Sequence, residues 1–433
     1  MNKKVPFFSI VIPTRNRGKM LVESAIPSVI DQDFDDYEIV VCDNNSSDNT
    51  KELVYKLIEN NNRIRYVYSS EWIPKEKFFE FSLKQANGEY SILFFDDDVF
   101  VKGALKFCYE ILSKFNVSVF TFSNKVVYFY PDWLDAKMKN VLKVPFYTGE
   151  IILKNSNEQL KGIYDELDLI SGSPDVTNSF YKTSFILNLI NKYGTLLPYG
   201  HMGDYTIACY SLANTDYYFF YDGPIIIFGH WSQNTSQQLR LLKTTMEEYK
   251  KWIEWAKENL LKDMPFKEYL FSNCIVATLL KMKDQLNLPY SIDLKRYFQK
   301  LYTDIQTLKY YNENEGLFLQ KSLLETIKNL NIKLNFSFPL PHPSKIKLPP
   351  QIFKGDVYGF DNIMNARNFF SLTQSTSKIK SDDIINTITK IISFSLRYGS
   401  RILKKFSKKF YKKILRFLKK VSLYILLKEE EDV

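Results

Sequence analysis

Three consecutive aspartates, Asp96, Asp97 and Asp98, follow the apolar run at residues 90–95 (YSILFF). Like charges this close together repel one another, so the cluster is costly unless a cation accompanies it. Carboxylate oxygens are ligands that suit Mg²⁺ and Mn²⁺, and such an ion can in turn hold a diphosphate. Alternate residues of an extended segment point the same way, which predicts that Asp96 and Asp98 share one ligand while Asp97 faces elsewhere. The alternative is a solvated acidic loop.

Two further polar clusters follow apolar runs earlier in the chain. Asp43 comes directly after residues 37–42 (YEIVVC), and residues 14–17 (TRNR) follow residues 7–13 (FFSIVIP). A carboxylate at a strand end can accept a hydrogen bond from a nucleobase N–H or from a ribose hydroxyl. Asp43 could equally form an Asx turn with the residues after it, and residues 14–17 could be a plain polar turn. Both interpretations stay open at this point.

The first hundred residues predict the elements that would position these clusters. Short apolar runs typical of buried strands alternate with stretches whose apolar residues have helical spacing. This alternation favours a mostly parallel sheet with helices on both faces, and ligands of such sheets bind at the carboxyl ends of the strands. The three clusters fall at those ends. We expect strands at 7–13, 37–42, 65–68 and 90–95, and helices at 20–31, 51–60 and 77–86.

The rest of the chain divides by pattern and composition. After a helix at 104–113 and a strand at 117–129, the stretch 131–175 reads as irregular, and mixed α/β structure returns at 176–230. Helical spacing then dominates, and a Pro-containing stretch reads as an extended connector. We therefore predict four regions: an α/β domain at 1–236, a helical region at 237–331, a connector at 332–383 and a tail at 384–433.

Most of the positive charge lies in the tail. The chain carries a net charge of +9, and residues 397–428 contain 12 Lys or Arg and no Asp or Glu, so the remainder has a net charge of −3. This distribution argues against a body that binds nucleic acid. Lysine pairs alternate with apolar residues in the tail, as in a helix with one cationic and one apolar face. Such a helix suits an anionic membrane surface, and the alternative is docking on the acidic body or on a second copy.

No other segment predicts a membrane insertion. The first eight residues lack the apolar region of a signal peptide, and no run of about 18 uncharged apolar residues is present. We therefore expect no helix that spans a membrane, and a peripheral association through the tail.

Three segments together resemble a known family. They are SIVIPTRNR, YEIVVCDNNSSDNT and GEYSILFFDDDV, in this order and at ordinary spacing. Over residues 1–236 the chain resembles the inverting glycosyltransferases of family 2, in the branch that carries three aspartates and works in bacterial surface polysaccharide synthesis. The resemblance implies the GT-A fold, which is Rossmann-like, and a nucleotide diphosphate sugar as donor.

The resemblance also implies roles for the polar clusters. The first loop and Asp43 would hold the base and ribose of the nucleotide, and the aspartates would bind its diphosphate. Many family members have an Arg-Asn pair in the helix before the aspartates, and this chain reads KEKFFEFSLKQANGEY there, which leaves Lys75 or Lys77 for the phosphates. The residues expected at the nucleotide sugar are Pro13, Thr14, Asn16, Arg17, Asp43, Lys75, Asp96 and Asp97.

A metal site and a general base follow from the same resemblance. Asp96, Asp98 and His230 would hold Mn²⁺ or Mg²⁺, His230 because such enzymes often place a histidine after the last core strand. Asp204 stands where the family keeps its general base, although Gly203 replaces the carboxylate that usually precedes it. Asp204 could instead be only the N-cap of a helix at 205–213, and His230 a surface loop histidine.

The function implied is the transfer of a sugar, with inversion, from a nucleotide diphosphate sugar to a glycan acceptor. We expect a lipid-linked acceptor, met at the cytoplasmic face of the cell membrane, and no nucleic acid partner. Two alternatives remain. A sugar-phosphate nucleotidyltransferase would need a Gly-rich loop, and residues 13–18 hold a single glycine. A membrane- or nucleic-acid-binding protein with an inactive GT-A domain would not need the aspartates.

Overall fold

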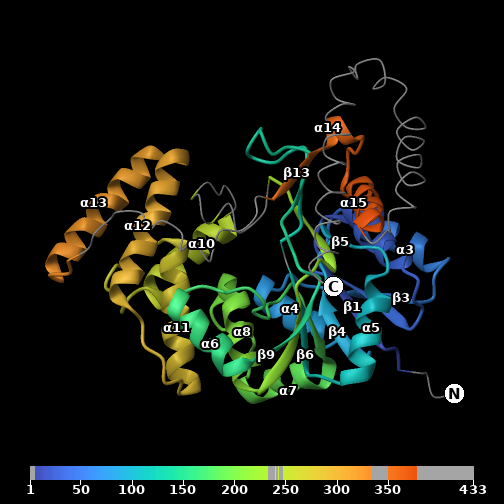
Figure 1. Cartoon of the computed structure of the whole chain (residues 1–433), viewed down its shortest axis with the longest axis horizontal. Helices are drawn as coiled ribbons and strands as arrows, with labels where there is room; N and C mark the ends of the chain where they lie inside the picture. Colours follow the sequence, from blue (N-terminus) through green and yellow to red (C-terminus); the bar gives the residue numbers. More distant parts are fainter. Residues whose placement is uncertain are drawn as a thin grey trace, which may run out of the picture.

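The computed structural model of the chain describes residues 5–123, 125–232, 239, 242, 247–333 and 350–377. Within these residues it is a mixed α/β structure with one sheet of eight strands and one of five (Figure 1). The larger sheet has the order β3-β2-β1-β4-β10-β6-β11-β9. Its strands are β1 (Phe8–Thr14), β2 (Tyr37–Asp43), β3 (Ile64–Tyr68), β4 (Tyr90–Leu93), β6 (Val119–Phe122), β9 (Ile151–Asn155), β10 (Ser179–Lys182) and β11 (Tyr217–Tyr221).

The parallel half of this sheet confirms the expected parallel strands with helices on both faces. β1 pairs in parallel with β2 and β4, and β2 with β3, so their carboxyl ends meet at one edge. Side chains of β1 alternate between two apolar cores: Ile10 and Ile12 pack on one face, Val11 on the other. After the short α1 (Gly18–Met20), the first core includes residues of η1 (Leu21–Ala25), α2 (Ile26–Ile30), α3 (Thr50–Ile58) and α5 (Ala104–Phe115). The second includes residues of α4 (Lys75–Leu83), α6 (Ser156–Glu166), α7 (Thr183–Tyr193) and α8 (Gly203–Ala213).

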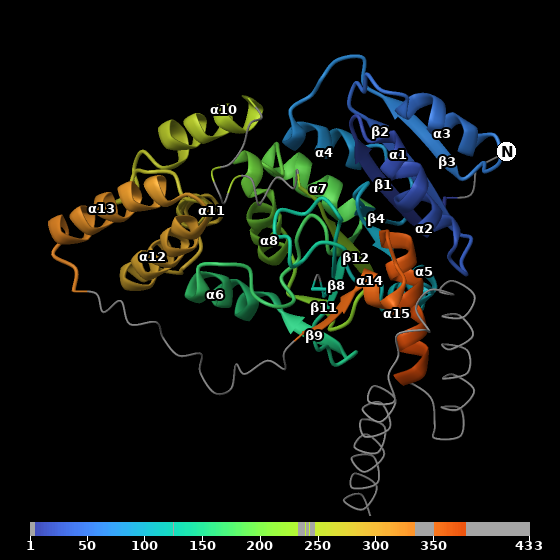
Figure 2. The same cartoon turned by 90° about the horizontal axis from the view of Figure 1, so that it is seen from above.

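A helical region follows the sheet and shares its second core. Apolar side chains of these helices belong to the same cluster as those of α6 and α8. The hydroxyl of Tyr164 on α6 donates to the carbonyl of Leu279 at 2.7 Å, which fixes the two regions together. Figures 1 and 2 show these helices as one group beside the sheet. They are α10 (Glu247–Trp255), η3 (Ala256–Leu260), α11 (Phe271–Leu286), α12 (Leu294–Tyr311) and α13 (Glu313–Asn329).

The structure differs from three of the expectations drawn from the sequence, and two of them involve the smaller sheet. The segment at 117–129 is two strands in different sheets, β6 and β7, and the stretch at 131–175 is ordered as β8, β9 and α6. The connector expected at 332–383 also folds where it is described: β13 pairs with β8, with Gln351 opposite Val144, and two helices follow it. The elements are β5 (Val99–Phe100), β7 (Val127–Phe129), β8 (Val141–Val144), β12 (Ile226–His230), β13 (Gln351–Lys354), α14 (Gly355–Tyr358) and α15 (Ile363–Ser377).

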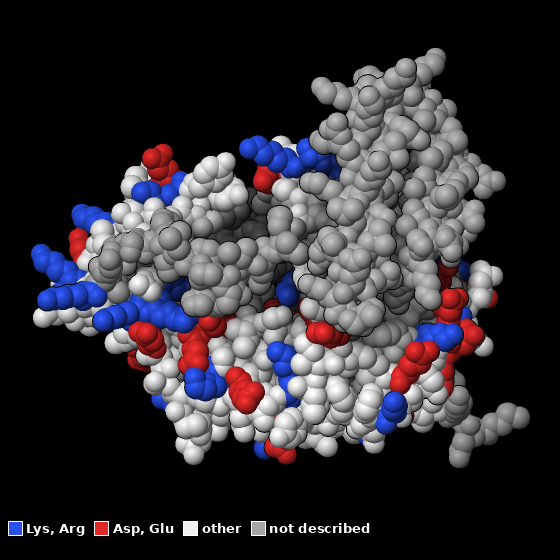
Figure 3. Space-filling view, viewed as in Figure 1, with Lys and Arg blue, Asp and Glu red and all other residues white. Residues whose placement is uncertain are grey.

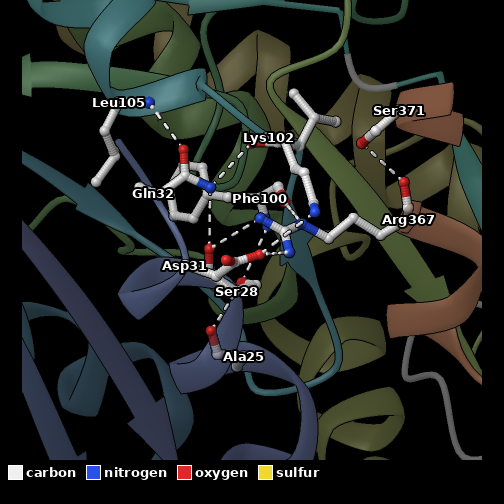
Figure 4. Close-up of polar contacts among 10 residues, drawn as sticks. Ala25, Ser28, Asp31, Gln32, Phe100, Lys102, Leu105, Arg367 and Ser371 are labelled. Carbon is white, nitrogen blue, oxygen red and sulfur yellow. Dashed lines mark hydrogen bonds and ion pairs between the residues drawn. The ribbon is translucent and has the colours of Figure 1, made fainter. Parts of the chain in front are cut away.

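A buried arginine fastens α15 to the first hundred residues of the chain (Figure 4). The side chain of Arg367 is fully buried. Its guanidinium group donates to the carbonyls of Phe100 at 2.6 Å and Ser28 at 3.4 Å, and it forms a 2.8 Å ion pair with Asp31. Apolar residues of α15 pack against the smaller sheet in the same place. The C-terminal segment is therefore part of the domain core.

The tail at 384–433, with its expected cationic helix, lies outside the described residues. Within those residues, no helix is long and apolar enough to cross a membrane. On the face shown in Figure 3, acidic and basic side chains are interspersed, as the near-neutral charge of the body predicts.

Candidate active site

The three aspartates lie between β4 and β5, at the carboxyl edge of the parallel strands. Asp96 and Asp98 are buried, and Asp97 is half-buried. The hydroxyl of Thr14 donates to Asp96 at 2.8 Å, whereas Asp98 accepts from the backbone N–H of Gly229 at 2.9 Å. The two carboxylates thus have partners on different strands, β1 and β12. In the described part of the chain, no three His, Cys, Asp or Glu side chains are grouped closely enough to hold a metal ion.

The cluster has the electrostatic strain that the sequence predicts. Burial, and then the charge of Asp97, raises the pKa of Asp98 well above its usual range. Burial raises the pKa of Asp97 to about 6, with a further contribution from Asp96, although Arg17 and Lys75 pull it down. A cation beside these carboxylates would relieve this strain, so the chemistry of the donor set fits a hard divalent ion.

Arg17 already supplies one positive charge to the cluster. Its guanidinium group forms an ion pair with Asp96 at 2.8 Å and stacks over the ring of Trp231 at 4.4 Å from the ring centre. Trp231 comes directly after β12, so this contact joins the first loop to the end of the smaller sheet. An arginine over an indole is stabilised by the ring's negative face.

The first loop and the loop after β2 form one connected structure. Asn16 adopts a φ of 55° and accepts from the N–H of Ser47 at 2.7 Å, while its own N–H donates to Ser46 at 2.8 Å. Asp43 is buried, and its two oxygens accept from the N–H of Ser46 at 2.8 Å and from the hydroxyl of Tyr66 at 2.5 Å. Asp43 therefore caps its own loop through the N–H three residues on, and not through the N–H two residues on that defines an Asx turn. Pro13, within β1, lies opposite Cys42 in the parallel register.

Lys75 lies electrostatically between Asp97 of the cluster and Asp204, and Lys75 and Asp204 belong to different helices. Lys75 begins α4, and burial lowers its pKa while the charge of Asp204 raises it. Desolvation, and then the charge of Asp175, raises the pKa of Asp204 to about 7, against the pull of Lys75. Asp204 is exposed to solvent. Asp204 lies in the first turn of α8, whose N-cap is Met202, and it is therefore not the capping residue.

His230 lies at the end of β12, and its imidazole ring packs against two aromatic side chains. Its ring centre is 5.4 Å from those of both Phe129 and Trp133. Burial, aided by Lys143, lowers its pKa to about 4, so the imidazole is neutral at physiological pH. Nδ1 is buried and has no hydrogen-bond partner among the residues that the structure describes. The structure does not group this ring with Asp96 and Asp98.

Sequence reasoning missed two residues that shape the aspartate turn. A side chain at Gly229 would place its Cβ 1.9 Å from the carbonyl oxygen of Asp97, so only glycine fits there. The hydroxyl of Tyr130 donates to the same carbonyl at 3.2 Å. Gly229 follows a β-branched run, which is a weak signal of close backbone approach, whereas nothing in the local sequence distinguishes Tyr130 from the other tyrosines.

Comparison with known proteins identifies the part of the chain that carries Asp43 and the three aspartates, whereas Asp204 and His230 lie beyond it. The family model described as glycosyl transferase family 2 matches residues 9–164. Residues of this chain are 40% identical over 102 positions to the GalNAc(5)-diNAcBac-PP-undecaprenol beta-1,3-glucosyltransferase of Campylobacter jejuni, a match that covers 23% of this chain and 33% of that protein. They are 28% identical over 111 positions to the UDP-Glc:alpha-D-GlcNAc-diphosphoundecaprenol beta-1,3-glucosyltransferase WfgD of Escherichia coli, covering 25% and 42%.

These matches span a third to two-fifths of the length of the curated relatives. A solved structure of residues 1–349 of TarS from S. aureus, in complex with UDP-GlcNAc, aligns over 74% of this chain and 88% of its own at 14% identity, with a TM-score of 0.40. The family match includes β1, β2 and the aspartate turn, which are the segments that carry the resemblance in the sequence. Residues 9–164 of this chain therefore form a glycosyl transferase family 2 domain.

Proposed function

We propose that the protein transfers a sugar, with inversion, from a nucleoside diphosphate sugar to a lipid-linked glycan in bacterial surface polysaccharide synthesis. The family of the domain supports glycosyl transfer. The two relatives above are named as glucosyltransferases, with acceptors linked through diphosphate to undecaprenol. Glucose is therefore the first sugar to test, and a polyprenyl diphosphate glycan is the first acceptor.

The donor would bind at the edge formed by β1, β2 and β4. Arg17 and Lys75 bring two positive charges beside Asp96 and Asp97, where a diphosphate would need them. Pro13, Thr14, Asn16 and Asp43 line the connected loops next to that edge and would contact the base and ribose. Asp96 and Asp98 would hold Mn²⁺ or Mg²⁺. His230 would be a third ligand only after its imidazole ring turns away from Phe129 and Trp133. When bound, the ion would neutralise charge on the leaving diphosphate.

The observation that carries the proposal is the family match of residues 9–164, and the exposed Asp204 beside Lys75 provides the candidate base. A carboxylate with a pKa of about 7 is half ionised at neutral pH, which suits a general base that must take a proton from an acceptor hydroxyl. Lys75 interacts electrostatically with both Asp204 and Asp97, which links the proposed base to the proposed diphosphate site. The hydroxyl oxygen would attack the anomeric carbon as Asp204 accepts its proton, and the diphosphate would leave in the same displacement.

A screen with two stages tests the proposal. Thermal melting with Mn²⁺ and a panel of nucleoside diphosphate sugars identifies the donor, with excess chelator as the control. Transfer of the labelled sugar to a short-chain alkyl diphosphate GlcNAc then tests the reaction, and we expect UDP-glucose to succeed in both stages. A protein that neither melts at higher temperature nor turns over with any donor would instead be the binding protein with an inactive domain.

We further propose the division into four regions, 1–236, 237–331, 332–383 and 384–433, with part of the third built into the domain core through Arg367. The tail at 384–433 would bind an anionic membrane surface at the cytoplasmic face, where a lipid-linked acceptor is reached. The net charge of −3 outside residues 397–428 is the reason we expect no nucleic acid partner for the body.

A further inference from the structure

One residue of the loop before α8 connects α4 to α8 through buried hydrogen bonds. The backbone N–H of Leu196 donates to the carboxylate of Glu80 on α4 at 2.7 Å, and its carbonyl accepts from the hydroxyl of Thr206 on α8 at 2.7 Å. The hydroxyl of Thr195 donates to the same oxygen of Glu80. Glu80 is 8% exposed, and Leu196 and Thr206 are fully buried. We call Glu80, Leu196 and Thr206 the Leu196 bridge.

The Leu196 bridge joins the two helices that carry Lys75 and Asp204. Lys75 begins α4, five positions before Glu80, and Asp204 lies in the first turn of α8, two positions before Thr206. The charges of Lys75 and Asp204 act on each other. Because a helix fixes the relative positions of residues this close in sequence, the separation of the two charged groups depends on how α4 and α8 are held together.

Packing of the loop against the start of α8 supports the same connection. Leu197 lies against Gly203, since a Cβ at Gly203 would be 2.5 Å from Cδ2 of Leu197. Gly203 directly precedes Asp204, so the loop at 195–197 contacts the beginning of α8 both by packing and by a hydrogen bond. Phe78 and Leu83 anchor α4 in the second core. The loop is therefore the part that can move Asp204 relative to Lys75.

The Leu196 bridge depends on a buried carboxylate. None of the ion pairs among the described residues includes Glu80. A buried carboxylate without a cation is costly unless hydrogen-bond donors reach it, and both donors here belong to the loop. An apolar side chain could fill the same space without this cost. The stability of the core alone therefore does not account for a glutamate at this position.

We propose that Glu80 is a positioning residue that holds Asp204 in place relative to Lys75 through Leu196. This inference rests on the proposed glycosyl transfer, in which Asp204 is the base. It gives α4 two roles, because the helix that brings Lys75 to the donor diphosphate also fixes the group that deprotonates the acceptor.

The groups around Asp204 determine the sign of the expected effect. Asp175, before β10, raises the pKa of Asp204, and Lys75 lowers it. Burial, and then Lys75, lowers the pKa of His201 to about 3, and burial raises the pKa of Tyr181 on β10, so both side chains are neutral near pH 7. Among these groups, Lys75 is the one that the Leu196 bridge holds beside Asp204. Loss of the bridge should therefore raise the pKa of Asp204.

Glu80→Met tests the bridge, because it removes the acceptor and fills a similar space. We expect kcat for transfer at pH 7 to fall about 100-fold, the effect of displacing a catalytic group by about 1 Å. The acidic limb of the kcat/KM profile should move to higher pH, with the donor Kd within about threefold. Glu80→Gln keeps an oxygen that accepts from both donors, so its kcat should stay within about threefold and its acidic limb should not move.

Ser82→Ala is the control on the same helix, because it removes a buried hydroxyl that donates to the carbonyl of Phe78 within α4. It should match the wild type in kcat and in the acidic limb. Thr206→Val removes the other half of the bridge, in case Glu80→Met does not fold, and it should move the acidic limb in the same direction. A folded Glu80→Met or Thr206→Val protein with the acidic limb of the wild type overturns the proposal, as does a Glu80→Gln protein that loses as much kcat as Glu80→Met.

Failure of the proposed function looks different, because the wild-type protein would then transfer no sugar. The Leu196 bridge is tested in that case by melting at pH 8, without any substrate. Asp204→Asn should raise the melting temperature more in the Thr206→Val background than in the wild type, since ionised Asp204 would have lost the compensating charge of Lys75. Equal gains in the two backgrounds overturn the positioning role.

Discussion

Arg17 forms a 2.8 Å ion pair with Asp96, although 79 positions separate them in the sequence. This contact connects the loop after β1 to the aspartate turn after β4 and places a positive charge where a donor diphosphate is expected. The guanidinium group also stacks on Trp231, so three segments of the chain converge on one carboxylate. The convergence makes the ends of β1, β4 and β12 a single site.

The aspartates give the first prediction. Asp96→Ala and Asp98→Ala should each abolish the rise in melting temperature that Mn²⁺ and UDP produce together, because each removes a carboxylate from the proposed ion site. The melting temperature without ligand should fall little or rise, since like charges are removed from a buried cluster. Asp165→Asn, at an exposed ion pair on α6, is the control. A full ligand-dependent rise in both variants would exclude these carboxylates from the ion site.

Ionisation of the Asp204 carboxyl group should lower the free energy of unfolding at alkaline pH. Its pKa in the folded protein, about 7, is above its usual value, so the folded protein binds the proton more tightly than the unfolded chain does. Ionisation of Asp204 therefore costs folding free energy, and this cost is complete above pH 7 and disappears near pH 4. Asp204→Asn should accordingly raise the melting temperature at pH 8 and leave it unchanged at pH 4. A lower melting temperature at pH 8 would indicate a structural role for the carboxylate.

Arg367 provides a prediction about stability alone. Arg367→Met should reduce the free energy of unfolding by about 3 kcal/mol, because it removes the ion pair with Asp31 and leaves the carbonyl of Phe100 without this donor. Lys102→Ala is the control, since Lys102 is 3.8 Å from the same Asp31 and exposed, and it should cost less than about 1 kcal/mol. Urea unfolding measures both. Equal effects would mean that the buried contacts of Arg367 contribute nothing of their own.

The tail at 384–433 can be removed without disturbing the contacts of Arg367. A chain that ends at Ser377 retains α15 and Arg367, and it should leave anionic liposomes for the supernatant on sedimentation. The expected loss is large because each Lys or Arg near such a surface contributes about 1 kcal/mol. Hydrolysis of the donor should be unchanged. Binding of the shortened chain as strong as that of the full chain would refute the tail as the membrane anchor.

The sequence was sufficient where structure depends on local pattern. β1, β2 and β4 are apolar runs that end in polar residues, so the strands and their shared edge could be predicted. β13 could not, because it is stabilised by pairing with β8, a strand about 200 positions away. The sequence around Arg367 does not indicate that this residue is buried, since its partners lie far away in the sequence, at α2 and β5. The site residues were named from the family pattern, whereas the contact of Glu80 with Leu196 depends on how α4 packs against a distant loop.

The most direct test of the account is the pH dependence of sugar transfer by wild-type protein and by Asp204→Asn, with donor binding measured in parallel. A general base with a raised pKa works only when ionised, so wild-type kcat/KM should fall as the pH drops through about 7. Asp204→Asn should lose at least about 100-fold in transfer at pH 8 and bind the donor as the wild type does. Transfer by Asp204→Asn at the wild-type rate, or loss of its donor binding, would contradict the account.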